Sequence, residues 1–258
     1  MKRPIILLAI ALSFIASLII QEPTAYGFEV AVGYWQQSPS GEIGYKADGS
    51  DDILDIEDDL DYGSEDRFFG RLKVELPLFL PNIYLMATPM EFDGEGSVDV
   101  DFEFGDETFK GNTPFDSRVR MDHYDITLYY NLPFIKKATL EKLNIELGIN
   151  ARILDFEADI DQDLTGISES YSITLAVPMI YAGIQIRPVK YFSIEGEGRV
   201  IAYSGNHYYD FIARAKITPF GPFFIAGGYR SENFKFNESD FEAEIVVDGP
   251  FAEVGIEF

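Results

Sequence analysis

Most of this chain is built from short segments in which apolar and polar side chains alternate one by one. Between residues 68 and 76, for example, Phe68, Leu72 and Val74 alternate with Arg71 and Lys73. Successive side chains of a β-strand point to opposite faces, so each such segment predicts a strand with one apolar and one charged face. A soluble sandwich would leave the charges in water, whereas a membrane barrel turns the apolar face to lipid and pairs the charges inside.

Hydropathy favours the membrane barrel. After residue 20 no apolar run reaches the roughly 20 residues that a spanning helix needs, and the mean hydropathy is −0.02. A transmembrane strand needs only about 9 to 11 residues with every second one apolar, so near-neutral hydropathy is expected. We predict ten strands, with eight as the alternative, over residues 28–35, 68–76, 83–90, 123–130, 145–152, 180–186, 192–200, 209–217, 223–230 and 241–258. Pro89 is expected to mark a bulge or the end of its strand.

The links between these segments alternate between compact and long. The compact links, each with a proline and a Phe or Tyr, cover residues 76–82, 132–143, 187–191 and 218–222. The mostly longer, polar links cover residues 37–66, 93–117, 155–170, 204–207 and 232–240, and the second of them is expected to hold a hairpin within residues 98–109. This asymmetry predicts an all-β fold: an antiparallel up-and-down transmembrane β-barrel with short periplasmic turns and long extracellular loops.

Both ends of the chain fit export to the bacterial outer membrane. Residues 1–27 combine a basic start, an apolar stretch and a small-residue cleavage site, which predicts a signal peptide followed by a barrel over residues 28–258. The last strand is expected to show the apolar series Phe241, Ala243, Ile245 and Val247, to reset at residues 248–250, and to end in an assembly signal for the barrel-assembly machinery formed by Val254, Ile256 and Phe258. The chain has no cysteine, so disulfides and thiolate chemistry are excluded.

Five features occur in order along the chain: Gly33-Tyr34-Trp35 with Ser40-Gly41, the acidic stretch 55–60, Leu80-Pro81-Asn82, residues 125–130 and residues 177–181. In this order they resemble an uncharacterised family of Gram-negative outer-membrane β-barrel proteins. The resemblance spans most of the chain beyond residue 27. It implies an outer-membrane location and a small barrel, and it carries no catalytic residue because the family has no assigned activity.

The charged strand faces are expected to meet inside the barrel. A lumen of about ten strands is just wide enough for side chains to fill, so the charges should pair and plug it. A narrow charge-lined channel for small solutes or ions is the alternative. The predicted network consists of Arg71, Lys73, Glu75, Asp125, Glu146, Arg152, Glu195, Glu197, Arg199, Asp210, Arg214, Lys216 and Arg230. Tyr34, Trp35, Tyr130 and Tyr229 are expected in the aromatic girdles that face lipid.

The formal net charge of −24 argues against nucleic acid as a partner. Carboxylates crowd the first long link, where Asp55, Glu57, Asp58, Asp59 and Asp61 are candidates for binding Ca²⁺ or Mg²⁺, although their order is not that of an EF-hand. The alternative is a solvated acidic surface that divalent ions bridge to lipopolysaccharide. No other cofactor is expected, and the expected partners are outer-membrane lipid and lipopolysaccharide around a monomer.

A catalytic role finds little support in the sequence. His123 lies near Asp125, and His207 follows Ser204, but neither belongs to a Gly-x-Ser-x-Gly elbow or another catalytic motif. We therefore expect no enzyme activity. Three functions compete: a structural or surface-interaction barrel, the narrow channel, and an outer-membrane lipid hydrolase.

Overall fold

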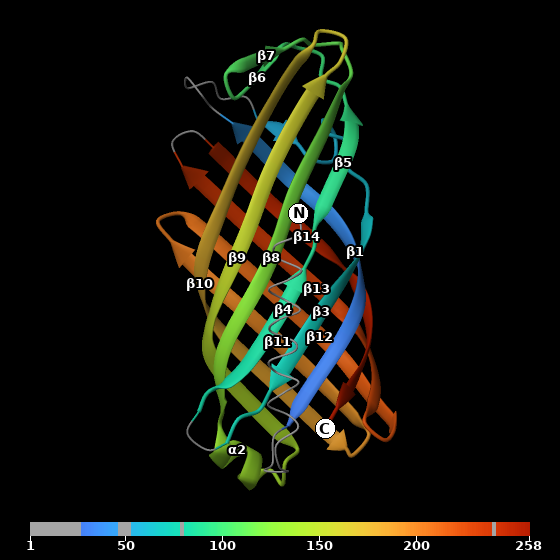
Figure 1. The fold of residues 1–258 in the computed structure, drawn as a ribbon, viewed down its shortest axis with the longest axis vertical. Helices are drawn as coiled ribbons and strands as arrows, with labels where there is room; N and C mark the ends of the chain where they lie inside the picture. The colour runs from blue at the N-terminus through green and yellow to red at the C-terminus, as the bar shows by residue number, and fades with distance from the viewer. Residues whose placement is uncertain (1–26, 46–52, 78–79, 239–240) are drawn as a thin grey trace, which may run out of the picture.

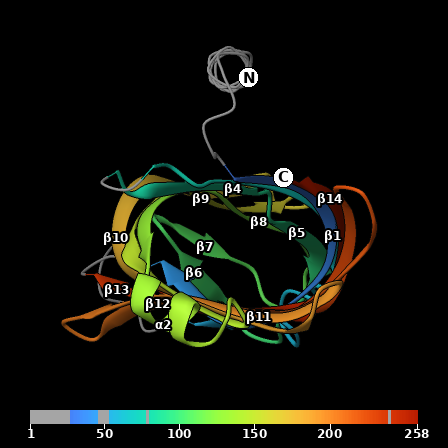
Figure 2. The ribbon, with the colours of Figure 1, turned by 90° about the horizontal axis from the view of Figure 1, so that it is seen from below.

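The computed structural model describes residues 27–45, 53–77, 80–238 and 241–258, and it shows a closed antiparallel barrel. Each strand of the wall pairs with the next wall strand along the chain, and the last pairs with the first. The strands that form the wall are β1 (Phe28–Tyr45), β3 (Glu65–Val74), β4 (Asn82–Thr88) with β5 (Glu91–Gly96), β8 (Phe115–Asn131), β9 (Leu143–Gln162), β10 (Ile167–Val189), β11 (Phe192–Tyr203), β12 (Asn206–Phe220), β13 (Phe223–Glu238) and β14 (Phe241–Glu257). Figure 1 shows the tilted wall and Figure 2 the closed ring.

The prediction of ten wall strands is confirmed, because β4 and β5 are two halves of one interrupted strand. Both pair with β8, and the break falls at Pro89 and Met90. Proline cannot donate to the ladder, and here the side chain of Asp122 accepts the Met90 amide at 2.9 Å while the Met90 carbonyl accepts the Met121 amide at 2.8 Å. The expected irregularity at Pro89 is therefore confirmed as an interruption.

Part of the way along each long strand, the apolar side chains move from the outward face to the inward face. In β9 the outward side chains are apolar from Leu143 to Ile153 and acidic from Asp155 to Asp161. The inward side chains change in the opposite direction, from polar residues up to Arg152 to apolar ones from Leu154 onward. The lower part of the strand thus faces lipid with a charged lumen behind it, and the upper part faces water with an apolar core behind it.

The change occurs at one level around neighbouring strands. Asp155 lies opposite Asp122 of β8 and Thr174 of β10, and Ile153 lies opposite Tyr124 and Ala176. The ten residue steps from Leu143 to Ile153, at ~3.3 Å each and tilted by about 40°, span about 25 Å, the height of an outer-membrane apolar belt. The barrel wall therefore continues well beyond the membrane on the side of the long connections.

This extension corrects several predicted boundaries. The polar segments predicted as loops at residues 155–170 and 232–240 are largely strand, because their polarity belongs to the outward face above the membrane. In β14 no reset occurs at residues 248–250: Phe241, Val247, Phe251 and Glu253 all point inward from one continuous strand. The apolar series at residues 241–247 consequently faces the core.

The connections differ between the two ends of the barrel. On the side of the short connections lie the two-residue turns Lys190–Tyr191 and Gly221–Pro222, and α2 (Pro133–Ala138), a short helix that the sequence did not indicate. At the other end, β2 (Leu54–Asp55) pairs with the upper part of β1, and the predicted hairpin, here β6 (Phe102–Phe104) with β7 (Glu107–Phe109), lies over the lumen (Figure 2). In the part of the chain that the structure describes, no helix is long and apolar enough to cross a bilayer.

Candidate functional site: the lumen and its periplasmic cavity

The upper cluster of the charge network lies just below the level where the lumen becomes apolar. Arg152 donates from Nε and Nη2 to the two carboxylate oxygens of Asp125, at 2.9 Å each, and it also bonds Asp210 and Glu232. Asp210 in turn accepts both Nε and Nη2 of Arg230 at 3.1 and 3.0 Å. All of these side chains are buried, so each charge depends on its partners for compensation.

The lower cluster joins strands from opposite sides of the ring. Arg71 of β3 donates to Glu197 of β11 at 2.8 Å, and Arg214 of β12 donates to Glu29 of β1 at 2.8 Å as well as to Glu195 and Glu253. Three tyrosines lie in the same layer. Tyr84 Oη donates to Glu197 at 2.9 Å and Tyr181 Oη donates to Glu146 at 2.6 Å. The ring of Tyr129 lies near Lys73. The contacts run across the lumen as well as along its wall.

Above the charges, aromatic side chains fill the lumen. The rings of Tyr171 in β10 and Phe241 in β14 stack with centroids 4.3 Å apart, and Phe156 of β9 packs against Phe241 at 5.2 Å. From the top, Phe104 of the hairpin reaches Tyr45 at 5.5 Å. We call this apolar filling the plug; β9 and β10 are not neighbours of β14 in the ring, so these contacts bridge the interior.

Trp35 corrects one prediction. The structure places its side chain in the lumen, fully buried, whereas Tyr34, Tyr130 and Tyr229 point outward as expected for girdle residues. The indole Nε1 donates to the Gly249 carbonyl at 3.2 Å. A Cβ on Gly249 would come 1.7 Å from the Gln36 carbonyl oxygen, so glycine at that position permits the close approach of β1 to β14.

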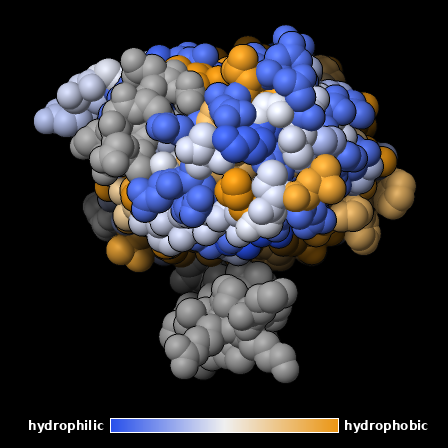
Figure 3. Space-filling model, turned by 90° about the horizontal axis from the view of Figure 1, so that it is seen from above, coloured by the Kyte–Doolittle hydropathy of each residue, from blue (hydrophilic) through white to orange (hydrophobic). Residues whose placement is uncertain are grey.

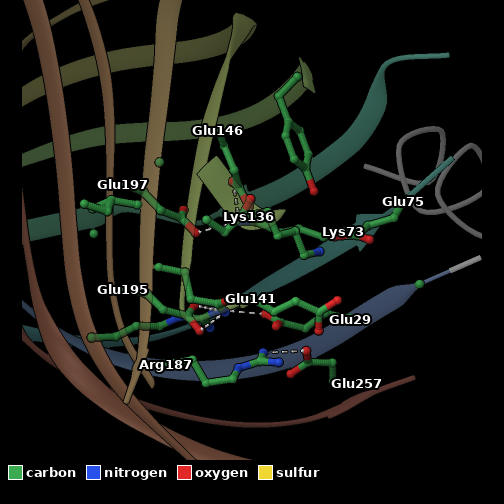
Figure 4. A pocket seen from close by; sticks show the side chains of 18 of the residues that line it. Glu29, Lys73, Glu75, Lys136, Glu141, Glu146, Arg187, Glu195, Glu197 and Glu257 are labelled. Atoms are coloured by element: carbon green, nitrogen blue, oxygen red, sulfur yellow. Dashed lines mark hydrogen bonds and ion pairs between the residues drawn. The ribbon is translucent and has the colours of Figure 1, made fainter. Parts of the chain in front are cut away.

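A cavity of about 170 Å³ remains at the periplasmic end of the lumen. Residues of eight strands and α2 line it, and Figure 4 shows their side chains converging on it. Its polar floor joins the lower cluster, and Tyr129 and Phe258 contribute rings. The charged lining residues are Glu29, Glu75, Glu141, Glu146, Glu195, Glu197 and Glu257 together with Lys73, Lys136, Arg187 and Arg214.

The structure brings the predicted network residues together, with Glu75 at the cavity rather than deep in the lumen. Glu75 accepts a long hydrogen bond of 3.4 Å from Asn131. The sequence interpretation assigned Glu232 to a loop and missed its role in the upper cluster. It also missed the lumenal tyrosines Tyr84, Tyr181 and Tyr208. Continuing the even-numbered series of β13 past Arg230 would have placed Glu232 inside.

The acidic loop serves a local structural purpose. Asp55 Oδ1 accepts the amides of Glu57 and Asp58 at 2.8 Å each, and Asp59 Oδ2 accepts the Asp55 amide at 2.8 Å. Apolar side chains that flank these acids and Asp61 in the same loop are buried in the core: Leu54, Ile56, Leu60 and Tyr62. Among the described residues, no three or more carboxylates or histidines converge in a way that could hold a metal ion.

The two histidines occupy unrelated places. His123 is fully buried in the upper cluster, where Nε2 lies 3.3 Å from Arg230 and 3.4 Å from Glu232. His207 is on the outward side of β12, with Nε2 at 2.6 Å from Asn233 Oδ1 and its ring stacked on Tyr209. Among the described residues, neither histidine shows a hydrogen bond to a serine or threonine hydroxyl.

Outer-membrane barrels are the solved structures that this chain resembles. The outer-membrane protease OmpT of Escherichia coli matches at a TM-score of 0.53 with 10% identity, over 92% of this chain and 99% of OmpT. Ail of Yersinia pestis matches at 0.37 with 13% identity, over 91% and 100%, and the translocator domain of NalP from Neisseria meningitidis at 0.45 with 10%, over 98% and 95%. No family model and no curated protein matches the chain. The match to OmpT shows a shared β-barrel fold, and the closed wall with its apolar belt places this chain in the bacterial outer membrane.

Proposed function

We propose that this protein is a sealed, monomeric outer-membrane barrel whose extracellular extension, rather than its lumen, carries its function. One observation supports the sealed state above all others: side chains from opposite walls meet at three successive levels. These levels are Arg71 with Glu197, Arg152 with Glu232, and Tyr171 with Phe241. A conducting path would have to separate buried ion pairs and stacked rings together.

Conductance of the folded protein in planar bilayers tests this proposal. We expect no steady single-channel current, because opening would leave buried charges uncompensated at about 3–5 kcal/mol for each broken pair. A matched pair of variants locates the seal. Phe241→Ser with Phe104→Ser loosens only the plug, and Arg152→Ala with Arg71→Ala removes only the ion pairs of the two lower levels, so each double variant should stay closed. The four substitutions together should conduct. A steady ohmic current from the native protein would overturn the proposal in favour of the channel.

The extension presents a mixed polar surface for contact with other molecules. Seen from above, the molecule is largely hydrophilic with scattered apolar patches (Figure 3). Its sides carry exposed ion pairs such as Arg118 with Asp159 and Arg120 with Glu157. We propose that carboxylates at this level, among them Asp122 and Asp155, contact lipopolysaccharide phosphates through Ca²⁺ or Mg²⁺. Chelator treatment should then lower the amount of lipopolysaccharide that copurifies with the protein.

We propose no enzymatic activity. The burial of His123 and the engagement of His207 with Asn233 leave neither imidazole placed to activate a hydroxyl or a water at the surface. Assays with lipopolysaccharide and ester substrates should show no cleavage by the native protein. Cleavage that is lost in His207→Ala would overturn this part of the proposal.

A further inference from the structure

More negative than positive side chains line the periplasmic cavity. Seven carboxylates and four cations line it, and three of the cations are already engaged. Lys73 lies 3.0 Å from both Glu146 and Glu197, Arg187 lies 3.3 Å from Glu257, and Arg214 binds carboxylates of the lower cluster. Behind the lining, Arg71 and Lys216 pair with four of the carboxylates, namely Glu29, Glu195, Glu197 and Glu257. Glu75 and Glu141 form no ion pair among the described residues, and these two carboxylates favour a cation as the occupant.

A buried amide oxygen gives an independent indication. Asn144 is 6% exposed and lines the cavity, and its Oδ1 has no hydrogen-bond partner among the described residues. Its Nδ2 donates to Asn131 Oδ1 at 3.0 Å and to Glu146 Oε1 at 3.4 Å. An ionised carboxylate only accepts, so Nδ2 must face Glu146 and Oδ1 must face away from it. An unpaired buried acceptor is costly unless a donor satisfies it.

The cavity wall already shows how this lumen holds an ammonium group. Lys73 Nζ lies between two carboxylates and within 4.8, 5.6 and 6.0 Å of the ring centroids of Tyr84, Tyr129 and Tyr181. Carboxylates together with aromatic faces bind alkylammonium ions well. By contrast, the described residues offer no cluster suited to a metal ion. The volume of about 170 Å³ equals about five or six waters at ~30 Å³ each, which suits a short alkyl chain.

We propose that the periplasmic cavity binds a small alkyl diamine, with one ammonium group between Asn144 Oδ1 and the Glu75 carboxylate. Glu75 is suited to this because, among the described residues, its carboxylate accepts only the long hydrogen bond from Asn131. The site lies at the opposite end of the lumen from the extracellular extension, so the diamine proposal and the proposed function can be tested separately.

Calorimetric titration of the folded barrel in detergent with 1,4-diaminobutane tests the site. We expect saturable heat from the native protein and about ten-fold or greater weakening in both Glu75→Gln and Asn144→Ala, since a hydrogen bond to a charged group is worth at least ~1.5 kcal/mol. Glu57→Gln, which removes one carboxylate from the extracellular loop, is the matched control and should bind as the native protein does. Retained heat-modifiable migration on gels shows that each variant is folded.

Three results would overturn the proposal. Absence of saturable heat with the native protein would remove the site. Equal weakening by Glu57→Gln and Glu75→Gln would show diffuse attraction to an acidic protein. Equal or tighter binding of Mg²⁺ or inorganic phosphate, with the diamine displaced, would assign the cavity to a metal ion or an anion.

Discussion

The guanidinium of Arg230 lies 4.7 Å from the centre of the Trp35 ring, at the level where the lumen changes from charged to apolar. The same guanidinium bonds Asp210 and donates to Thr88 Oγ1 at 3.0 Å. Trp35 therefore packs against the upper cluster through its contact with Arg230. A cation over an aromatic face that is shielded from water gains about 2 kcal/mol or more.

Fluorescence of Trp35 can test this placement, because it is the only tryptophan in the chain. A buried lumenal indole should emit at short wavelength and should resist quenching by iodide in water and by brominated acyl chains in the bilayer. Arg230→Leu should change the emission, whereas Arg118→Leu on the outer surface should not. Strong quenching by brominated lipid would return Trp35 to the girdle and contradict the structure.

Asp210 is the carboxylate on which the upper cluster depends most. It accepts hydrogen bonds from Arg152, Arg199 and Arg230 and is fully buried. Asp210→Asn leaves three buried guanidinium groups short of one negative charge, so the free energy of unfolding should fall by about 3–5 kcal/mol. Urea unfolding in micelles measures the change. Asp116→Asn, on an exposed position of β8, should stay within ~0.5 kcal/mol; a similar loss in both variants would argue against the network.

Much of the transmembrane part of the fold could be predicted because alternation and charge agree there. In β12, Ala213, Ala215 and Ile217 alternate with Arg214 and Lys216. Because charged side chains cannot face hydrocarbon without a large cost, the apolar side must face lipid and the charged side the lumen. The strand count and the compact turns followed from the same pattern.

The extracellular part could not be placed by the same rule. Once a strand leaves the bilayer its apolar face turns from lipid to core, so the series from Phe241 to Val247 points inward although its pattern resembles that of a lipid-facing strand. The Asp248-Gly249-Pro250 sequence resembles a turn, but Gly249 is required there by the close approach of Gln36. The lumenal site likewise needed the cross-strand distances, which pattern alone does not give.

The inversion along β9 predicts opposite responses to the same substitution on one face of one strand. Ile149 points outward within the apolar belt, and Asp161 points outward above it, opposite Asp116. Ile149→Arg should cost about 2–4 kcal/mol, as for a charge near the bilayer midplane. Asp161→Arg should be neutral or stabilising by about 0.2–1 kcal/mol, since it replaces a like-charge pair by an opposite one. Unfolding in lipid vesicles measures both; comparable costs would mean that the belt does not end near Ile153.

The loop that precedes the β6–β7 hairpin should respond to acid through Asp101. Lys110 Nζ donates to Asp101 Oδ2 at 2.7 Å and the Gly111 amide donates to Oδ1 at 2.9 Å, and these bonds, the one from Lys110 first, hold the pKa of the carboxyl below its ordinary value. A depressed folded-state pKa means that the stabilisation is present above the ordinary value of about 3.9 and is lost as the pH falls through the folded pKa. Carbon-13 titration of the carboxyl should show the depressed pKa in the native protein and a value nearer the ordinary one in Lys110→Met. Unchanged titration in Lys110→Met would mean that the ion pair does not form in solution.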